Sequence, residues 1–208
     1  DTITVEFIGN ELLTDQSATI VTQTAAITST GFPNFYSLNF DGTNDYISTT
    51  LDADQDVMPI TTWEAWVYPI PGYNGMVFSM EDGGWDRFLY VRDGLFQMGH
   101  TNDGWSPAAV IFNTWQHVAV IYSGSNIKFY LNGTEYVFGS SEGNHSSVGL
   151  FTIGSRSAGD NYHFAGKIDE VRVWDDARTE SEIQTYMYSS PSGNENELVG
   201  YWKMDEGT

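Results

Sequence analysis

The chain has no cysteine, and it has only 8 Lys and Arg residues against 28 Asp and Glu residues. The absence of cysteine excludes disulfide bonds and thiolate-bound metals. The formal net charge of −20 makes nucleic acid and anionic membrane surfaces poor partners, because like charges repel. No apolar run approaches the roughly 20 residues that a membrane-spanning helix requires, so we expect no membrane insertion.

The composition is that of a folded chain, with 40% hydrophobic and 15% aromatic residues. A length of 208 residues fits one large β-sandwich, so we expect a single domain over residues 1–208. Short runs rich in Val, Ile, Phe, Tyr and Trp alternate with Gly, Asn and Asp turns at intervals of about ten residues, which is typical of such a sandwich. The predicted strands are Thr62–Tyr68, Met76–Met80, Phe88–Val91, Trp115–Tyr122, Ile127–Leu131, Glu135–Phe138, Phe151–Ile153 and Lys167–Trp174.

Local signals add turns and one helix to this pattern. Asn132–Gly133 predicts a tight hairpin, since both turn residues must adopt positive φ, and Asp93–Gly94 and Asn74–Gly75 are read in the same way. The sequence from Thr179 to Glu182 has the spacing of a capping box, and an apolar face follows it, which predicts a helix. The apolar residues of that face are Ile183, Tyr186 and Met187. Residues 198–208 are predicted to hold the closing strand, and the Thr-rich residues 1–30 are predicted to form atypical opening strands.

Six segments in this order resemble the laminin-G-like branch of the concanavalin A-like jelly rolls. They are Leu38-Asn-Phe-Asp-Gly-Thr-Asn-Asp-Tyr-Ile47, Trp63-Glu-Ala-Trp-Val-Tyr-Pro69, Trp115-Gln-His-Val-Ala-Val120, Lys128-Phe-Tyr-Leu-Asn-Gly133, Phe151-Thr-Ile-Gly154 and Gly166-Lys-Ile-Asp-Glu-Val-Arg-Val-Trp174. The resemblance implies an all-β, two-sheet antiparallel jelly-roll sandwich with one short helix near the C-terminus. It also implies a non-catalytic module that binds glycans or proteins, often with calcium, in a secreted multidomain protein.

Calcium has three candidate locations, of which the third is the group of acidic loops that is also predicted to bind glycan. The resemblance implies a structural Ca²⁺ held by Asp41 or Asp45 together with Asp169, although Asp41 also fits a simple turn and Asp169 a local pairing. The run Asp52–Asp56 has carboxylates at its first, third and fifth positions, but it lacks the glycine and the bidentate glutamate of an EF-hand loop. It remains a candidate for an irregular site.

Catalytic patterns are not supported. Asp169 and Glu170 are adjacent, so their side chains would point to opposite faces of a strand, unlike the paired carboxylates of a glycoside hydrolase. Ser141 lies in a Gly- and Ser-rich loop rather than at a nucleophile elbow. The four histidines have no metal-ligand spacing, and His117 is interpreted as a packed residue of a strand.

Glycan binding is the leading hypothesis, because three predicted loops combine acids or amides with glycine and an aromatic residue. The candidate ligand-binding residues are Trp85, Asp86, Asp103, Trp105, Asp160 and Tyr162. The candidate stacking platforms are Trp85, Trp105, Tyr73 and Tyr162, while Trp63, Trp66, Trp115, Trp174 and Trp202 are assigned to the core.

We therefore expect an extracellular or cell-surface module, bound to other domains of the same polypeptide within an adhesin or a polysaccharide-active protein. It would bind a glycan or a cell-surface polysaccharide, with calcium as a structural or bridging ion. The alternative is a structural spacer or a protein-interaction domain that binds no sugar.

Overall fold

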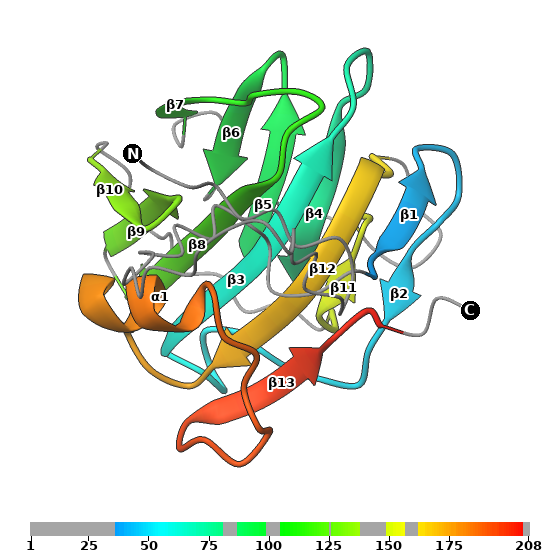
Figure 1. Ribbon diagram of the computed structural model, residues 1–208. Coiled ribbons are helices and arrows are strands. Elements are labelled where there is room, and N and C mark those ends of the chain that lie inside the picture. The colour runs from blue at the N-terminus through cyan, green and yellow to red at the C-terminus, as the bar shows by residue number, and fades with distance from the viewer. Residues whose placement is uncertain are drawn as a thin grey trace, which may run out of the picture. The chain divides into compact units, whose positions relative to one another are not determined.

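A computed structural model describes residues 36–80, 87–98, 105–124, 126–137, 149–156 and 162–205, with the backbone alone at 105–107. These residues belong to the unit Phe32–Thr208. They form two antiparallel sheets and a short helix, which confirms the predicted jelly-roll sandwich (Figure 1). The prediction for residues 1–30 lies outside the described residues. Within the described ranges, no helix has the length and apolarity to cross a membrane.

The larger sheet has seven strands in the described part of the chain, ordered β1-β12-β3-β8-β9-β10, with β13 also paired to β12. Its strands are β1 (Leu38–Asp41), β3 (Ile60–Pro69), β8 (Gln116–Ser123), β9 (Asn126–Leu131), β10 (Thr134–Tyr136), β12 (Ala165–Trp174) and β13 (Leu198–Trp202). The smaller sheet has six described strands in the order β2-β11-β4-β5-β6-β7. Its strands are β2 (Ile47–Ser48), β4 (Gly75–Met80), β5 (Arg87–Arg92), β6 (Leu95–Met98), β7 (Trp105–Ala109) and β11 (Thr152–Ile153).

The main core lies between the two sheets and is rich in aromatic rings. Trp63 of β3 is fully buried, and its ring meets those of Phe78 and Phe151 edge to face, with centroids 5.7 and 4.9 Å away. Such edge-to-face pairs are favoured by the ring quadrupoles. Trp66 and Trp174 are also buried, as predicted. The two remaining tryptophans assigned to the core, Trp115 and Trp202, are half-buried.

The hairpin turns follow two of the three predictions. Asn132 and Gly133 have φ values of 50° and 75°, and Asp93 and Gly94 have 51° and 78°, as tight primed turns require. Asn74–Gly75 is not such a turn, because Gly75 begins β4. A Cβ at Gly75 would lie 2.3 Å from the carbonyl oxygen of His163, so this glycine serves close backbone packing instead.

The predicted helix is α1 (Glu180–Tyr186), and both halves of its capping box are formed between Thr179 and Glu182. Ile183 is buried from the helix in a small cluster with Ala119, Ile121 and Tyr130, which is separate from the main core. The helix therefore covers the outer face of the larger sheet over β8 and β9 (Figure 1). The predicted closing strand is β13, which pairs with β12.

Candidate functional site

One candidate site is the outer face of the smaller sheet. Leu89 and Val91 of β5 point into the main core, so the alternating residues Phe88 and Tyr90 lie on the outer face, where they cluster with Met76. The register continues this row across β6. Gln97 is opposite Tyr90 on one side and opposite Trp105 of β7 on the other.

Tyr162 covers this row and is held in place by its neighbours. Its ring meets the ring of Tyr90 edge to face with centroids 5.6 Å apart, and the Arg156 guanidinium lies 5.9 Å from its centroid. Its carbonyl oxygen accepts a hydrogen bond of 2.9 Å from the N–H of Met76, and its φ of 70° turns the chain at this point. Despite these contacts, 36% of Tyr162 is exposed. The ring is therefore a fixed aromatic surface open to solvent.

Two more exposed tyrosines lie beside the segment 162–165, which begins with Tyr162. Tyr46 is 39% exposed, and its ring centroid is 6.3 Å from that of His163, the residue that follows Tyr162. Tyr73 is 47% exposed and packs on Gly42, where a Cβ would meet its ring at 2.8 Å. We call Tyr46, Tyr73 and Tyr162 the tyrosine surface.

Polar groups accompany these rings. Burial raises the pKa of Tyr90 to about 12, an effect that the charge of Arg92 opposes and that Tyr162 and Asp93 reinforce. The Tyr90 hydroxyl therefore keeps its proton at neutral pH and can donate a hydrogen bond. In the described part of the chain, the buried Oε1 atom of Gln97 has no hydrogen-bond partner. A buried acceptor of this kind is commonly satisfied by an ordered water molecule.

Most of the predicted ligand-binding residues fall outside the described ranges. This holds for Trp85, Asp86, Asp103 and Asp160, and for Trp105 only the backbone position on β7 is described. The segments 81–86 and 99–104 join strands whose described ends, at Met80–Arg87 and at Met98, lie at one end of the smaller sheet. Arg87 lies at this end of the sheet. Tyr90, whose ring contacts Tyr162, is three positions, or about 10 Å, further along β5.

Of the predicted calcium ligands, Asp41 and Asp45 lie together, whereas Asp41 is far from Asp169. Asp41 and Asp45 share a turn, in which Oδ1 of Asp41 accepts from the N–H groups of Thr43 and Asn44, and Oδ2 of Asp45 accepts from the N–H of Asp41. Asp41 is opposite Ala165, which is four positions, or about 13 Å, from Asp169 along β12. Among the described residues there is no group of three or more acids or histidines that could hold a metal ion.

The second calcium candidate, Asp52–Asp56, forms a turn around buried Asp54, whose carbonyl oxygen accepts from the N–H groups of Val57 and Met58. The Arg87 guanidinium fastens this turn by donating to the carbonyl oxygens of Ala53 and Met58, both within 2.8 Å. A buried positive charge at this position disfavours a bound cation.

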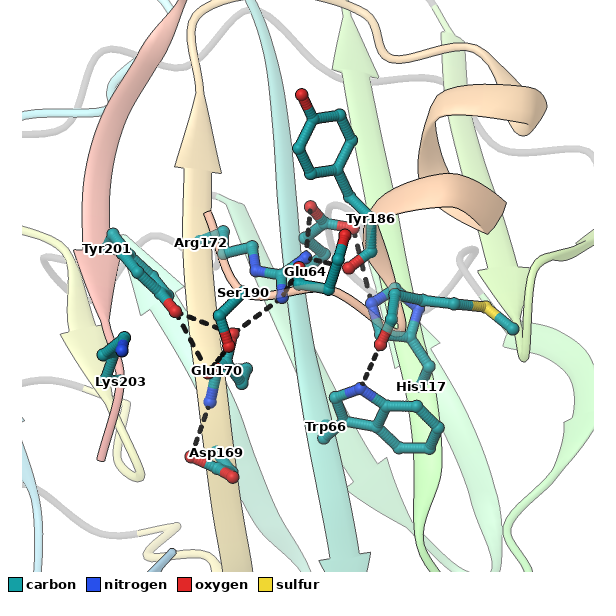
Figure 2. Close-up of polar contacts among 12 residues, drawn as sticks. Glu64, Trp66, His117, Asp169, Glu170, Arg172, Tyr186, Ser190, Tyr201 and Lys203 are labelled. Carbon is teal, nitrogen blue, oxygen red and sulfur yellow. Dashed lines mark hydrogen bonds and ion pairs between the residues drawn. The ribbon is translucent and has the colours of Figure 1, made fainter. Parts of the chain in front are cut away.

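A second cluster, which no sequence pattern predicted, is a buried polar network between the larger sheet and α1 (Figure 2). Glu64 of β3 lies at its centre. Its Oε1 accepts from the indole N–H of Trp174 at 2.7 Å and is 3.7 Å from Arg172, and its Oε2 is 3.4 Å from Nε2 of His117. Arg172 also donates to Glu170 at 2.7 Å.

Glu170 collects further donors at the other end of the network. Its carboxylate accepts from the hydroxyls of Ser190 at 2.8 Å and Tyr201 at 2.9 Å (Figure 2). A register shift falls between Asp169 and Arg172, and Glu170 has a φ of 52°, so the regular alternation expected for the two adjacent acids is interrupted here. All these acids are buried and bound by donors from the protein, so the network is suited to holding elements together rather than to turning over a substrate.

The sequence profile described as the concanavalin A-like lectin/glucanases superfamily, of laminin G type, matches residues 41–184. Among solved structures, a candidate carbohydrate-binding protein from Bacteroides ovatus has a TM-score of 0.65 at 24% identity, covering 82% of this chain and 51% of that chain. The present chain thus spans about half the length of that protein.

Two further structures share the fold. A SAP-like heptameric pentraxin from Limulus polyphemus has a TM-score of 0.57 at 20% identity over 81% of this chain and 91% of its own. The CBM40 of the Ruminococcus gnavus IT-sialidase, bound to α2,3-sialyllactose, has a TM-score of 0.55 at 17% identity over 76% of this chain and 99% of its own. At these identities the likeness concerns the fold alone. Among curated proteins, none matches the chain.

Proposed function

Because this chain belongs to the concanavalin A-like lectin/glucanases superfamily, we propose that it is a non-catalytic module that binds carbohydrate. The observation that carries the proposal is Tyr162, an exposed aromatic ring fixed by Tyr90, Arg156 and a backbone hydrogen bond. The sialyllactose bound to the Ruminococcus gnavus CBM40 and the carbohydrate-binding description of the Bacteroides ovatus protein support the same class of ligand.

The proposed ligand lies on the tyrosine surface. The apolar face of a sugar ring would stack on Tyr162, and the hydroxyls of Tyr46 and Tyr73 would exchange hydrogen bonds with sugar hydroxyls. Because Tyr162 is already held in one position, little conformational entropy is lost when a ligand binds. One such site gives weak affinity, so the module would gain avidity from neighbouring domains in a larger extracellular protein.

A role for calcium in structure or ligand binding is proposed separately from the stacking on Tyr162. The described residues contain no group of three or more acids or histidines that could hold a metal ion, so the stacking on Tyr162 is argued without an ion. A calcium-bridged ligand would need carboxylates in addition to this ring.

A glycan and polysaccharide array tests the proposal, run once in millimolar calcium and once in EDTA. We expect binding in at least one condition, and the difference between the two reports whether calcium takes part. The affinity for the strongest hit is then measured for Tyr162→Ala and for Tyr188→Ala, a matched tyrosine that is 45% exposed beside Trp66 on the larger sheet.

Loss of one stacking contact should weaken binding about 5- to 30-fold in Tyr162→Ala and leave Tyr188→Ala unchanged, since a ring contact with a ligand is worth roughly 1–2 kcal/mol. Equal affinities for the two variants would exclude the tyrosine surface. No binding to any glycan would overturn the proposal and favour a spacer or protein-interaction domain.

A further inference from the structure

The end of α1 is held by side chains that rise from the larger sheet. Arg172 donates to the carbonyl oxygens of Tyr186 at 2.7 Å and Ser189 at 3.1 Å, and the Trp66 indole donates to that of Met187 at 2.7 Å (Figure 2). These carbonyls belong to the last turn and the residues after it, which lack partners within the helix. With seven residues, α1 is too short to be stable by itself, so it depends on this attachment.

Trp66 packs on His117, and Arg172 lies beside Glu64, the acid that His117 faces. The ring centroid of Trp66 is 5.4 Å from that of His117, and the guanidinium of Arg172 is 3.7 Å from Oε1 of Glu64. His117 and Glu64 face each other at 3.4 Å, and each side chain is only 1% exposed. A change in the charge or position of His117 therefore affects both Trp66 and Arg172, the two side chains that hold the end of α1.

The surroundings of His117 suit a neutral ring. Its Nε2 faces the Glu64 carboxylate, whereas its Nδ1 is buried and has no hydrogen-bond partner in the described part of the chain. A second proton would create a buried N–H with no acceptor, which is costly. The charged groups acting on the ring are Glu64 from β3 and Arg172 from β12. From the β9–β10 turn, Asn132 contributes only an oxygen that accepts from the backbone N–H of His117.

Together, these surroundings lower the pKa of His117. Burial lowers the pKa of His117, Arg172 lowers it further, and the hydrogen bond and charge of Glu64 only partly offset them. Protonation is therefore disfavoured while α1 is attached, and a state that admits water to the ring would accept the proton more readily.

We propose that His117 and Glu64 form an acid-sensitive latch, and that protonation of His117 releases α1 and residues 187–190 from the outer face of the larger sheet while the sandwich stays folded. The separation of the two hydrophobic clusters permits this, because Ile183 packs with Ala119, Ile121 and Tyr130 and not in the main core. Release would expose that small cluster and the ring of Trp66.

Proton linkage sets the expected change of the release equilibrium with pH. The attached state binds fewer protons than the released state below the ordinary histidine pKa of about 6.5, so acid favours release. Between pH 7 and pH 5, a single histidine can raise the release equilibrium by at most about 25-fold.

Hydrogen exchange with mass spectrometry tests the latch. Peptides covering residues 180–190 are followed at pH 7, 6 and 5 in the wild type and in His117→Gln, with rates corrected for intrinsic exchange. Glutamine keeps an N–H directed at Glu64 but does not titrate. The control is His163→Gln, which removes the other described histidine, whose Nδ1 is 3.4 Å from the Asp45 carbonyl oxygen.

We expect the release equilibrium to rise tenfold or more in the wild type and in His163→Gln, and less than threefold in His117→Gln, while peptides of β3 and β8 stay protected. The latch is refuted if His117→Gln shows the wild-type rise, if α1 stays equally protected at pH 5, or if β3 and β8 lose protection together with α1. Should His117→Gln fail to fold, NMR titration of the wild type decides. The His117 ring must then take up its proton over the same pH range in which α1 begins to exchange, and a mismatch refutes the latch.

Discussion

Trp174 donates its indole N–H to Glu64 across 2.7 Å, joining neighbouring strands β12 and β3 in a fully buried contact. This bond satisfies one oxygen of a carboxylate whose other oxygen faces His117. The Trp174 ring also carries the guanidinium of Arg178 at 4.1 Å from its centroid. A single side chain thus supports both the buried acid and the start of the segment that leads into α1.

Replacing Trp174 by Phe keeps a ring but removes the donor to Glu64. The buried carboxylate then loses a hydrogen bond, and we expect the free energy of unfolding to fall by about 2–3 kcal/mol. Urea denaturation followed by circular dichroism measures the change. Trp202→Phe is the control, because that half-buried ring stacks on Phe151 and should lose about 1 kcal/mol or less. Equal losses in the two variants would show that the hydrogen bond to Glu64 contributes little to the free energy of unfolding.

The Glu64→Gln variant should show a pH-dependent loss of stability. Burial raises the pKa of the Glu64 carboxyl, but the bond with His117, the charge of Arg172 and the bond from Trp174 outweigh it, so the pKa lies below its usual value. The ionised carboxylate therefore stabilises the fold above pH 4.5, and this contribution is lost as the pH falls further.

Glu64→Gln should therefore be less stable than the wild type by about 3 kcal/mol at pH 7, and the difference should shrink below about pH 4.5. Chemical denaturation at pH 7, 5, 4 and 3 gives the two curves. A difference that stays constant over this range would mean that Glu64 does not titrate with folding.

Gly75→Ala should be strongly destabilising for a steric reason. The new Cβ would lie 2.3 Å from the His163 carbonyl oxygen and 2.5 Å from the Phe164 Cα, both backbone atoms that cannot easily move. We expect a loss of about 3 kcal/mol or more in the free energy of unfolding. Gly193→Ala is the comparison, because its φ is 87° but nothing lies within 4 Å of its Cβ, so only backbone strain of about 1 kcal/mol applies. A smaller loss at Gly75 than at Gly193 would contradict the packing described here.

Thr179→Ala removes the N-cap of α1. The Thr179 hydroxyl accepts from the N–H of Glu182, and the Glu182 carboxylate accepts from the N–H of Thr179. We expect a loss of about 1 kcal/mol, seen as faster hydrogen exchange of residues 180–186. Thr185→Ala, whose hydroxyl donates to the Ser181 carbonyl oxygen within the helix, should have a much smaller effect. Similar exchange rates in the two variants would mean that the N-cap does not contribute to the stability of α1.

Much of the fold could be predicted because its signals are local. Short apolar and aromatic runs separated by Gly, Asn and Asp turns located the strands from β3 to β5 and from β8 to β12. Asn132–Gly133 located a turn, and Thr179–Glu182 located the start of the helix. These patterns act over a few residues, where backbone geometry decides. Strands β6 and β7 were not among the predicted strands, and Pro107 within β7 weakens the strand pattern there.

The buried network could not be predicted, because it depends on which strands become neighbours. Glu64, His117 and Arg172 are far apart in the sequence and meet only because β3 lies between β12 and β8. The interpretation of His117 as a packed strand residue is confirmed by its burial, but its partner could not be named. Likewise, the register alone keeps Asp41 and Asp169 apart. In the candidate site, Tyr73 and Tyr162 could be chosen as aromatics near turns, whereas the support of Tyr162 by Tyr90 required the three-dimensional structure.

The most direct test of the proposed carbohydrate site is an NMR titration of labelled protein with the glycan that binds best on the array. If the glycan binds on the tyrosine surface, the ring signals of Tyr162, Tyr46 and Tyr73 shift with a common dissociation constant, while those of Tyr188 and Tyr201 on the opposite sheet do not. Shifts confined to the larger sheet, or no shifts at a saturating glycan concentration, would contradict it.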